Sequence, residues 1–254
     1  MVAAAWVGAL LVGLVLGLLG SGGSILTVPV LVYLVGEPSK VAIAESLGIV
    51  TLISGVGAIP FAVRKKVSWR SVVLFGLPGT GGAYLGALVS DFIPGALQLA
   101  IFAVVMLLAA VLMFRKTSLH HRDDGPRAAW KIMLDGILVG ILTGLVGVGG
   151  GFLIVPALVL LGGLPMHLAI GTSLFVIAIK SIGGFYKYVE MLGPDQIQWD
   201  LMLLFGALGI VGSFVGARMG AYVPQAKLKR IFAGFLLVMG ALILWQNAAA
   251  LLGG

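Results

Sequence analysis

One short sequence occurs twice in this chain, and each copy lies within a long apolar stretch. Residues 17–29 read GLLGSGGSILTVP, and residues 144–156 read GLVGVGGGFLIVP. Eight of the thirteen positions are identical: Gly17/Gly144, Leu18/Leu145, Gly20/Gly147, Gly22/Gly149, Gly23/Gly150, Leu26/Leu153, Val28/Val155 and Pro29/Pro156. Glycine weakens a helix and permits a positive φ, so each cluster interrupts a run that could otherwise cross a bilayer as one helix. Any fold of this chain must accommodate two matching breaks.

The composition around the repeats is that of a membrane protein. Hydrophobic residues make up 60% of the chain and charged residues only 10%, and the mean hydropathy is +1.17. Soluble domains carry about 25% charged residues. Apolar runs of a length that spans the hydrocarbon layer recur along the whole sequence. We therefore predict an all-α polytopic protein embedded in the lipid bilayer.

The net charge of +7 does not indicate a nucleic-acid partner, because the basic residues gather in short loops between apolar segments. Residues 64–70, 115–131 and 218–230 hold most of them, which is the pattern of cytoplasmic loops in membrane proteins. The chain has no cysteine, and its histidines show no spacing typical of metal ligands. We expect no metal site and no cofactor.

The duplication extends far beyond the short motif. Identities continue at an offset of 127 as far as Gly57/Gly184, and at an offset of 130 from Leu74/Leu204 to Pro94/Pro224. We predict a first transmembrane repeat (1–114), a polar cytoplasmic linker (115–131) and a second repeat (132–254), forming one integrated membrane domain. Small-residue stripes in both repeats predict close helix packing: Gly79, Gly82 and Gly86, with Gly209, Gly212 and Gly216.

Loop charges predict that the two repeats are inverted. The loop at 64–70 is strongly basic, whereas its counterpart at 187–200 holds three acidic residues against one lysine. The next pair of loops reverses this bias, since 91–95 has no basic residue and 218–230 has four. Basic loops favour the cytoplasm, so equivalent loops lie on opposite sides of the membrane. This arrangement predicts a multi-pass protein of the inner (plasma) membrane with both termini outside the cytoplasm.

An odd number of crossings per repeat is needed for inversion. Clear spans are predicted at about 40–63, 70–90, 96–114, 165–187, 200–217 and 231–247. The segments 4–36 and 130–163 must then each contribute an even number of crossings. A hairpin of two short helices that meet at the glycines satisfies this count. We expect about five helical segments per repeat, of which the first two form a broken, glycine-rich hairpin.

Two such hairpins could form an anion site. A helix that begins at the glycines exposes free N–H groups and the positive end of its dipole. Matching interruptions in the two halves of a transporter typically mark its binding site. The candidate backbone groups are those of Gly22, Gly23, Gly149, Gly150 and Gly151. In the alternative interpretation these glycines only permit tight packing of the hairpins.

Hydroxyl groups gather around the two motifs and on the helix that follows each. Membrane helices often use such hydroxyls to bond their own carbonyl groups, which is the alternative to a binding role. Recurrence at Ser46/Ser173 and Ser54/Ser181, eight residues apart and on one helix face, favours the binding role. The candidates are Ser21, Ser24, Ser46, Ser54, Thr172, Ser173 and Ser181.

Two ionisable residues lie inside predicted spans, where charges are costly and usually functional. Lys180 lies about two turns from the end of its span and could bind an anionic substrate. Glu45 is a candidate proton carrier or a partner for Lys180, with a place near the interface as the alternative. Neither residue has a counterpart of its own kind, because Glu45 matches Thr172 and Lys180 matches Ile53.

With these residues in view, nearly the whole chain resembles the TauE/SafE family of sulfite and organosulfonate exporters. The resemblance rests on the duplicated motif at 20–29 and 147–156, and on the sequence AIGTS at 169–173. It implies an inner-membrane permease for small sulfur-containing anions, usually exported. The first repeat departs from this pattern, with AIAES at 42–46. Sulfite, sulfoacetate and related sulfonates of two or three carbons all agree with the resemblance.

The sequence therefore predicts a secondary transporter of small oxyanions, with protons as a possible coupling ion. A passive anion channel that uses the same glycines remains open as an alternative. A membrane-embedded enzyme is disfavoured, because the histidines lie in or beside loops and the predicted spans contain only one convincing carboxylate. The sequence does not indicate an oligomeric state.

Overall fold

The structure is a computed structural model, and it describes residues 2–90, 95–114, 128–146 and 151–252. Over these ranges all regular structure is helical. The helices are α1 (Val2–Leu19), α2 (Gly23–Val30), α3 (Ser39–Gly57), α4 (Ile59–Val63), α5 (Trp69–Ser71), α6 (Leu77–Ser90), α7 (Gly95–Phe114), α8 (Ala129–Val146), α9 (Gly151–Pro156), α10 (Met166–Leu192), α11 (Trp199–Tyr222) and α12 (Gln225–Leu252). Short π-helical segments η1 (Leu31–Val35), η2 (Val72–Gly76) and η3 (Ala157–Leu161) and a 3₁₀ turn η4 (Pro194–Gln196) join them.

The predicted all-α membrane architecture is confirmed. Four segments are long and apolar enough to cross a membrane: Val41–Val63, Met166–Glu190, Trp199–Tyr222 and Gln225–Trp245. Shorter apolar helices occupy Ala5–Leu19, Ala103–Phe114 and Gly151–Leu161. The short ones include an arm of each predicted hairpin, as the sequence led us to expect.

The first predicted break is present at Gly20. Helix α1 ends at Leu19, Gly20 has φ +80°, and α2 begins at Gly23. The N–H of Gly20 still donates to the carbonyl of Leu16 at 2.7 Å, which closes the helix end. A side chain at this position would be strained, and its Cβ would lie 2.7 Å from Ser173 Oγ and 2.8 Å from Ile170 Cα. The second predicted break, at residues 147–150, lies outside the described residues.

Proline gives the outgoing arm of both hairpins the same irregularity. Pro29 lies inside α2 and Pro156 ends α9, and each arm then continues as a π-helical segment, η1 or η3. Proline has no N–H to donate and its ring crowds the preceding turn. A π-helical turn accommodates both effects without ending the helix. The repeated proline of the motif therefore has a repeated structural consequence.

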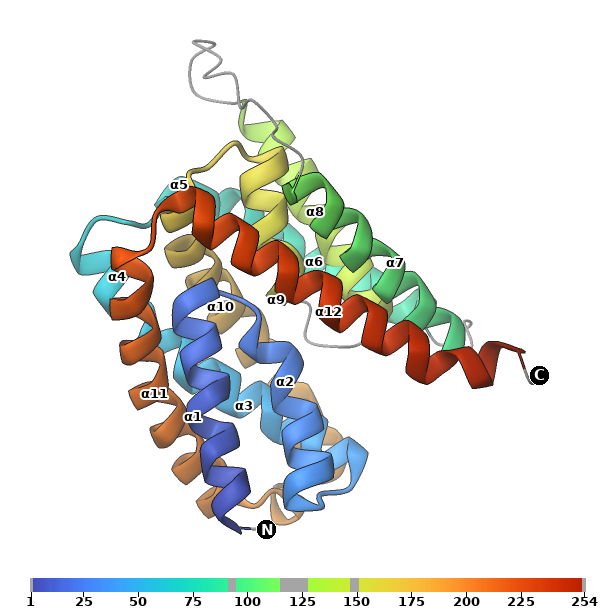
Figure 1. The fold of residues 1–254 in the computed structure, drawn as a ribbon. Coiled ribbons are helices and arrows are strands. Elements are labelled where there is room, and N and C mark those ends of the chain that lie inside the picture. Colours follow the sequence, from blue (N-terminus) through green and yellow to red (C-terminus); the bar gives the residue numbers. More distant parts are fainter. Residues whose placement is uncertain (1, 91–94, 115–127, 147–150, 253–254) are drawn as a thin grey trace.

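The most extensive helix contacts join the two repeats. Helix α1 lies along α11, α6 along α8, α7 along α12 and α3 along α10 (Figure 1). A Cβ at Gly13 would overlap the carbonyl of Gly209, and one at Gly140 would overlap the carbonyl of Gly79. These two contacts are equivalent, since Gly13 matches Gly140 and Gly79 matches Gly209 in the duplication.

The predicted small-residue stripes are confirmed as packing surfaces. Gly212 leaves no room for a Cβ beside the carbonyl of Leu10, and Gly82 leaves none beside the carbonyl of Ile137. Helices that touch backbone to backbone gain van der Waals contact that larger side chains would prevent. The stripes therefore fix how closely α1 approaches α11 and α8 approaches α6.

Helices α3 and α10, which are equivalent in the duplication, run antiparallel. Gly48 of α3 lies beside Phe185, whereas Phe61 of α4 lies beside Gly171, near the start of α10. A rising residue number on one helix therefore meets a falling number on the other. Ser173, near the start of α10, lies against the first hairpin, where its hydroxyl bonds the carbonyl of Gly20.

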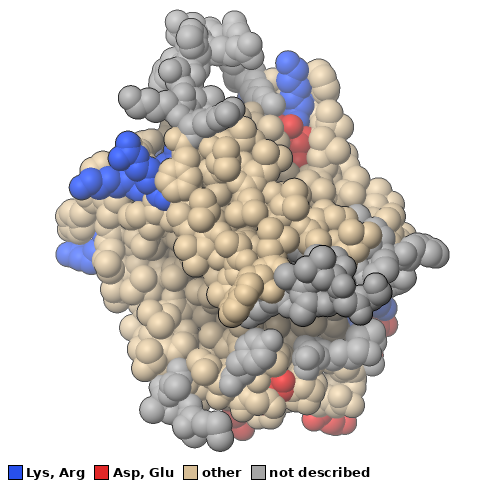
Figure 2. Space-filling view, turned by 45° about the vertical axis from the view of Figure 1, so that its right-hand side comes forward, with Lys and Arg blue, Asp and Glu red and all other residues tan. Residues whose placement is uncertain are grey.

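The charged residues lie toward the ends of the molecule. On the face that Figure 2 shows, most Lys and Arg side chains gather toward one end, most Asp and Glu side chains toward the other, and an uncharged belt lies between them. Arg64 and Lys66 share one end with the junction of α11 and α12. Glu37 precedes the long segment Val41–Val63 and therefore belongs to the other end. The uncharged belt is the surface expected to face lipid.

Candidate functional site

The two glycine motifs contact each other at the start of their outgoing arms. A Cβ at Gly151, the first residue of α9, would lie 3.1 Å from Ser24 Oγ in the first turn of α2. Ser24 and Gly151 are equivalent positions in the duplication. The nearest atom to that Cβ, at 2.9 Å, is Cδ1 of Ile177 on α10. Two equivalent positions of the duplicated motif therefore lie side by side.

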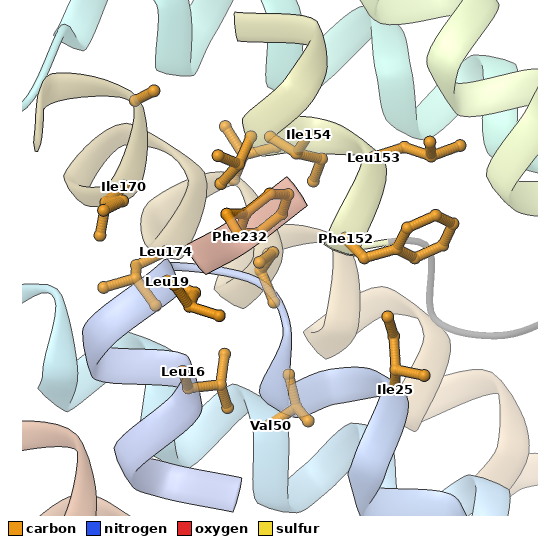
Figure 3. Close-up of a cluster of buried hydrophobic side chains, with 14 of the residues drawn as sticks. Leu16, Leu19, Ile25, Val50, Phe152, Leu153, Ile154, Ile170, Leu174 and Phe232 are labelled. Carbon is orange, nitrogen blue, oxygen red and sulfur yellow. The ribbon is translucent and has the colours of Figure 1, made fainter. Parts of the chain in front are cut away.

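Apolar side chains surround this junction. Leu16, Leu19 and Ile25 from the first hairpin approach Phe152, Leu153 and Ile154 from α9, with Leu174, Ile170 and Phe232 beside them (Figure 3). All of these side chains are buried. The described part of the junction is thus closed and dry in this conformation, so an ion could reach it only after the hairpins or their neighbours move.

Gly22 and Gly23 are both needed for packing. A Cβ at Gly22 would lie 2.9 Å from Phe235 Cε1 and 3.0 Å from Val15 Cγ1. One at Gly23 would overlap the carbonyl of Val12, about two turns before the end of α1. These contacts agree with the packing interpretation of the two glycines. The N–H groups of Gly22 and Gly23 lie at the start of α2. Gly149 and Gly150 lie outside the described residues.

Four of the seven candidate hydroxyls bond backbone carbonyls three or four residues earlier in the chain. Ser24 donates to Ser21 O at 2.8 Å and Ser46 to Ile43 O at 2.7 Å. Thr172 donates to Leu168 O at 2.7 Å and accepts from the N–H of Ser68 at 2.9 Å. It thereby fastens the basic loop at 64–68 to α10.

Ser173 is the exception, because its hydroxyl also reaches the first hairpin. It lies 2.8 Å from Ile170 O in its own helix and 3.0 Å from the carbonyl of Gly20. The second of these bonds holds the positive-φ turn against α10. The sequence marks Ser173 as a candidate, since it is the last residue of the AIGTS sequence at 169–173.

Two predicted site hydroxyls are buried without a partner. Ser21 Oγ, in the hairpin turn, and Ser54 Oγ, on α3, make no hydrogen bond within the described structure, and both residues are fully buried. Ser181, the counterpart of Ser54, is also buried. An unpaired buried hydroxyl costs about 1–3 kcal/mol. Such groups are unusual in a native protein and favour a role in another conformation or with a ligand.

Lys180 connects α10 to the second glycine motif. Its Nζ lies 3.3 Å from the hydroxyl oxygen of Thr143, which in turn donates to Gly140 O at 2.9 Å. Thr143 directly precedes Gly144, the first residue of the motif. The lysine is half-buried. The sequence interpretation missed Thr143, although a hydroxyl beside the motif was a usable signal.

Glu45 belongs to a different cluster, at the acidic end of the molecule. Its Oε1 accepts the N–H of Gln198 at 2.8 Å, and the side-chain amide of Gln198 donates to Glu37 Oε1 at 2.5 Å. Glu45 is fully buried, and its Oε2 has no partner in the described structure. Among the described residues, Glu45 and Lys180 form no ion pair with each other. No pattern in the sequence connects Glu37 or Gln198 with Glu45.

Comparisons with known proteins agree on one family. A protein-family model described as "Sulfite exporter TauE/SafE" matches residues 5–243. A "probable membrane transporter protein" of Xylella fastidiosa (strain Temecula1) is 35% identical, over 95% of this chain and 94% of its own length. A protein with the same description from Methanocaldococcus jannaschii is 26% identical, over 92% of this chain and 94% of its own length. Another, from Haemophilus influenzae, is 28% identical, over 90% and 92%. No solved structure matches the chain.

Proposed function

Because the chain belongs to the sulfite exporter TauE/SafE family, we propose that this multi-pass membrane transporter exports small sulfur-containing anions by a secondary mechanism. Sulfite, sulfoacetate and related sulfonates of two or three carbons are its candidate substrates. The observation that carries the proposal is the meeting of the two motifs at their equivalent positions, Ser24 and Gly151. Lys180, a half-buried lysine of α10, is joined through Thr143 to the second motif.

The two repeats are proposed to be inverted, with alternating access about the axis between Ser24 and Gly151. The antiparallel course of α3 and α10 supports this relation, because these are the equivalent helices of the two repeats. The helix pairs support it too. Helix α1 packs on α11, and α8, the equivalent of α1, packs on α6, the equivalent of α11. Inverted halves can rock against each other around a fixed site near the middle of the bilayer.

The proposed site takes the anion between the hairpins. Lys180 supplies positive charge, the N–H groups at the start of α2 and α9 supply donors, and the unpaired hydroxyls of Ser21 and Ser54 become partners of the anion when the junction opens. Ser46, Ser173, Thr172 and Ser181 belong to the helices that line it. The closed junction explains why these groups face apolar neighbours in this conformation.

The basic end is proposed to face the cytoplasm of a cell whose plasma membrane holds the protein. Segregation of basic and acidic residues to opposite ends supports this orientation (Figure 2). It would place both termini outside the cytoplasm.

The first experiment is a thermal-shift screen of the purified protein against sulfite, sulfoacetate, sulfate and simple carboxylates. A ligand that binds the folded state raises the melting temperature as its concentration exceeds Kd. We expect a dose-dependent shift with sulfite or sulfoacetate and none with an uncharged analogue. A shift with carboxylates alone would contradict the substrate class. A passive channel would give the same shifts, and accumulation against a gradient separates it from a transporter.

Glu45 is proposed to carry the coupling proton. A buried carboxylate with an oxygen that has no donor is costly unless it binds a proton. Glu45→Gln keeps the shape and the acceptor for the Gln198 N–H but removes the titration. We expect this variant to transport sulfoacetate down its gradient while losing acceleration by an imposed pH gradient, measured in proteoliposomes.

The matched control is Glu190→Gln, which removes an exposed carboxylate from α10. It should keep the full response to the pH gradient. If Glu45→Gln responds to pH as the wild type does, the proposed coupling role is wrong, whatever the substrate proves to be.

A further inference from the structure

A pocket opens at the basic end of the molecule, directly beside the first hairpin turn. Arg64, Lys66 and His167 line it, together with Gly17, Leu18 and Ile170. It contains about 320 Å³ of empty space, part of which is open to solvent.

The charge around this pocket has one sign. Two lysine or arginine side chains and a histidine reach it from two different segments, and none of the described residues that line it is acidic. Basic residues of cytoplasmic loops are usually explained by orientation alone. Orientation requires positive charge near the membrane, but it does not require that the charges converge on a hollow.

The pocket leads toward the proposed anion site. Contacts of Gly13 with Gly209 and of Gly17 with Ser213 set α1 parallel to α11 in a register that brings Gly20 level with Gly216. The hairpin turn therefore lies about 9 Å inside the end of α11, at about 1.5 Å per residue. Ile170, which lines the pocket, is also the residue against which Gly20 packs. The turn that Ser173 bonds therefore adjoins the pocket.

The loop that carries the basic residues is held rigidly in place. The N–H of Ser68 donates to Thr172, and a Cβ at Gly171 would overlap the carbonyl of Lys66. The loop at 64–68 is thus docked on α10 one turn from His167. Fixed charges at the mouth of a cleft concentrate ions of the opposite sign and speed their capture.

We propose that this pocket is a second, outer binding site for small oxyanions, formed by Arg64, Lys66 and His167, which loads the central site from the cytoplasmic side. The inference rests on the proposed function for its direction of loading, but the binding itself does not depend on transport. A divalent anion such as sulfite or sulfoacetate gains from two cations more than a monovalent one does.

The test uses the full-length protein with Lys180→Met, which disables the proposed central site, and titrates it with sulfite and with sulfoacetate by calorimetry. We expect weak, salt-sensitive binding that Arg64→Gln combined with Lys66→Gln weakens about 10-fold or more. The control is Lys65→Gln combined with Lys229→Gln. It removes the same charge from the same end of the molecule, and neither residue lines the pocket. It should bind as the parent does.

Transport supplies the second readout in an otherwise wild-type background. The Arg64→Gln/Lys66→Gln pair should raise KM for sulfoacetate about 10-fold at low ionic strength, with kcat nearly unchanged and the difference shrinking in high salt. A damaged fold would instead lower kcat at every ionic strength. Equal KM values for this pair and its control would overturn the proposal.

An anionic lipid headgroup carries similar chemistry, so the experiment is run in vesicles of phosphatidylcholine with and without phosphatidylglycerol. The proposal expects the defect in both. A defect seen only with phosphatidylglycerol would overturn it in favour of a lipid site. Salt-sensitive binding without any transport by the wild type would reject the proposed function and leave the outer site standing.

Discussion

Replacing Lys180 with methionine is expected to weaken the binding of sulfite and sulfoacetate at the central site and to abolish their transport, while the protein stays folded. Methionine keeps the length and apolar stem of the side chain but removes its charge. The lysine lies half-buried on α10, bonded to a hydroxyl beside the second motif, where water cannot fully replace it. A hydrogen bond to a charged group contributes about 1.5–3 kcal/mol. Its loss should raise Kd about 10- to 100-fold.

The chain offers a matched control on the same helix. Lys187 of α10 is exposed and bonds Glu190 at 3.0 Å, so Lys187→Met removes an equal charge without touching the proposed site. It should bind and transport as the wild type does. Thr143→Val, which removes only the neighbour of Lys180, should weaken binding less than Lys180→Met. Undiminished sulfoacetate affinity in Lys180→Met would reject the role of this lysine.

Adding one methyl group at Gly13 or at Gly140 is expected to prevent stable assembly of the two repeats. In each case the new Cβ would overlap a backbone carbonyl of the facing helix, at Gly209 or at Gly79. No change of rotamer relieves an overlap with backbone, so the helices must separate. Overpacking of this kind costs about 1–3 kcal/mol and often more. Both alanine variants should lose several degrees or more of melting temperature in detergent.

Gly55→Ala on α3 is the control for these variants. A Cβ at Gly55 would meet no atom within 4 Å, and alanine favours a helix over glycine by about 1 kcal/mol. This variant should be as stable as the wild type or more so. Equal melting temperatures for Gly13→Ala, Gly140→Ala and Gly55→Ala would mean that the helices do not pack as described. A large effect at only one of the two equivalent positions would contradict the symmetric exchange of partners.

Much of the helical layout could be predicted from the sequence, because local effects decide it. Hydropathy placed the helices, and glycine placed the first break, since only glycine takes the φ of +80° found at Gly20 without strain. The small-residue stripes that include Gly79 and Gly209 predicted close helix packing, which the structure shows. Which helices would meet was not predictable, because a stripe says that a neighbour is near but not which one.

The candidate site was harder to predict, because its partners come from distant segments. A buried serine in a sequence looks the same whether it bonds its own helix, as Ser46 does, or lacks a partner, as Ser54 does. Glu45 was recognisable as a charge within a span, yet its connection through Gln198 to Glu37 depends on the loop between α10 and α11 folding back over α3. Membrane orientation alone explained the basic loop at 64–70. The sequence therefore did not predict that two of its basic side chains line a pocket.

Counterflow in proteoliposomes tests the central claim most directly. Vesicles holding the purified protein are loaded with unlabelled sulfoacetate and diluted into a trace of labelled sulfoacetate. A transporter that alternates access about one anion site exchanges the two, so the label should accumulate transiently above its equilibrium level, and Lys180→Met should abolish this overshoot. Uptake that rises only to equilibrium, in the wild type as in the variant, would contradict the account.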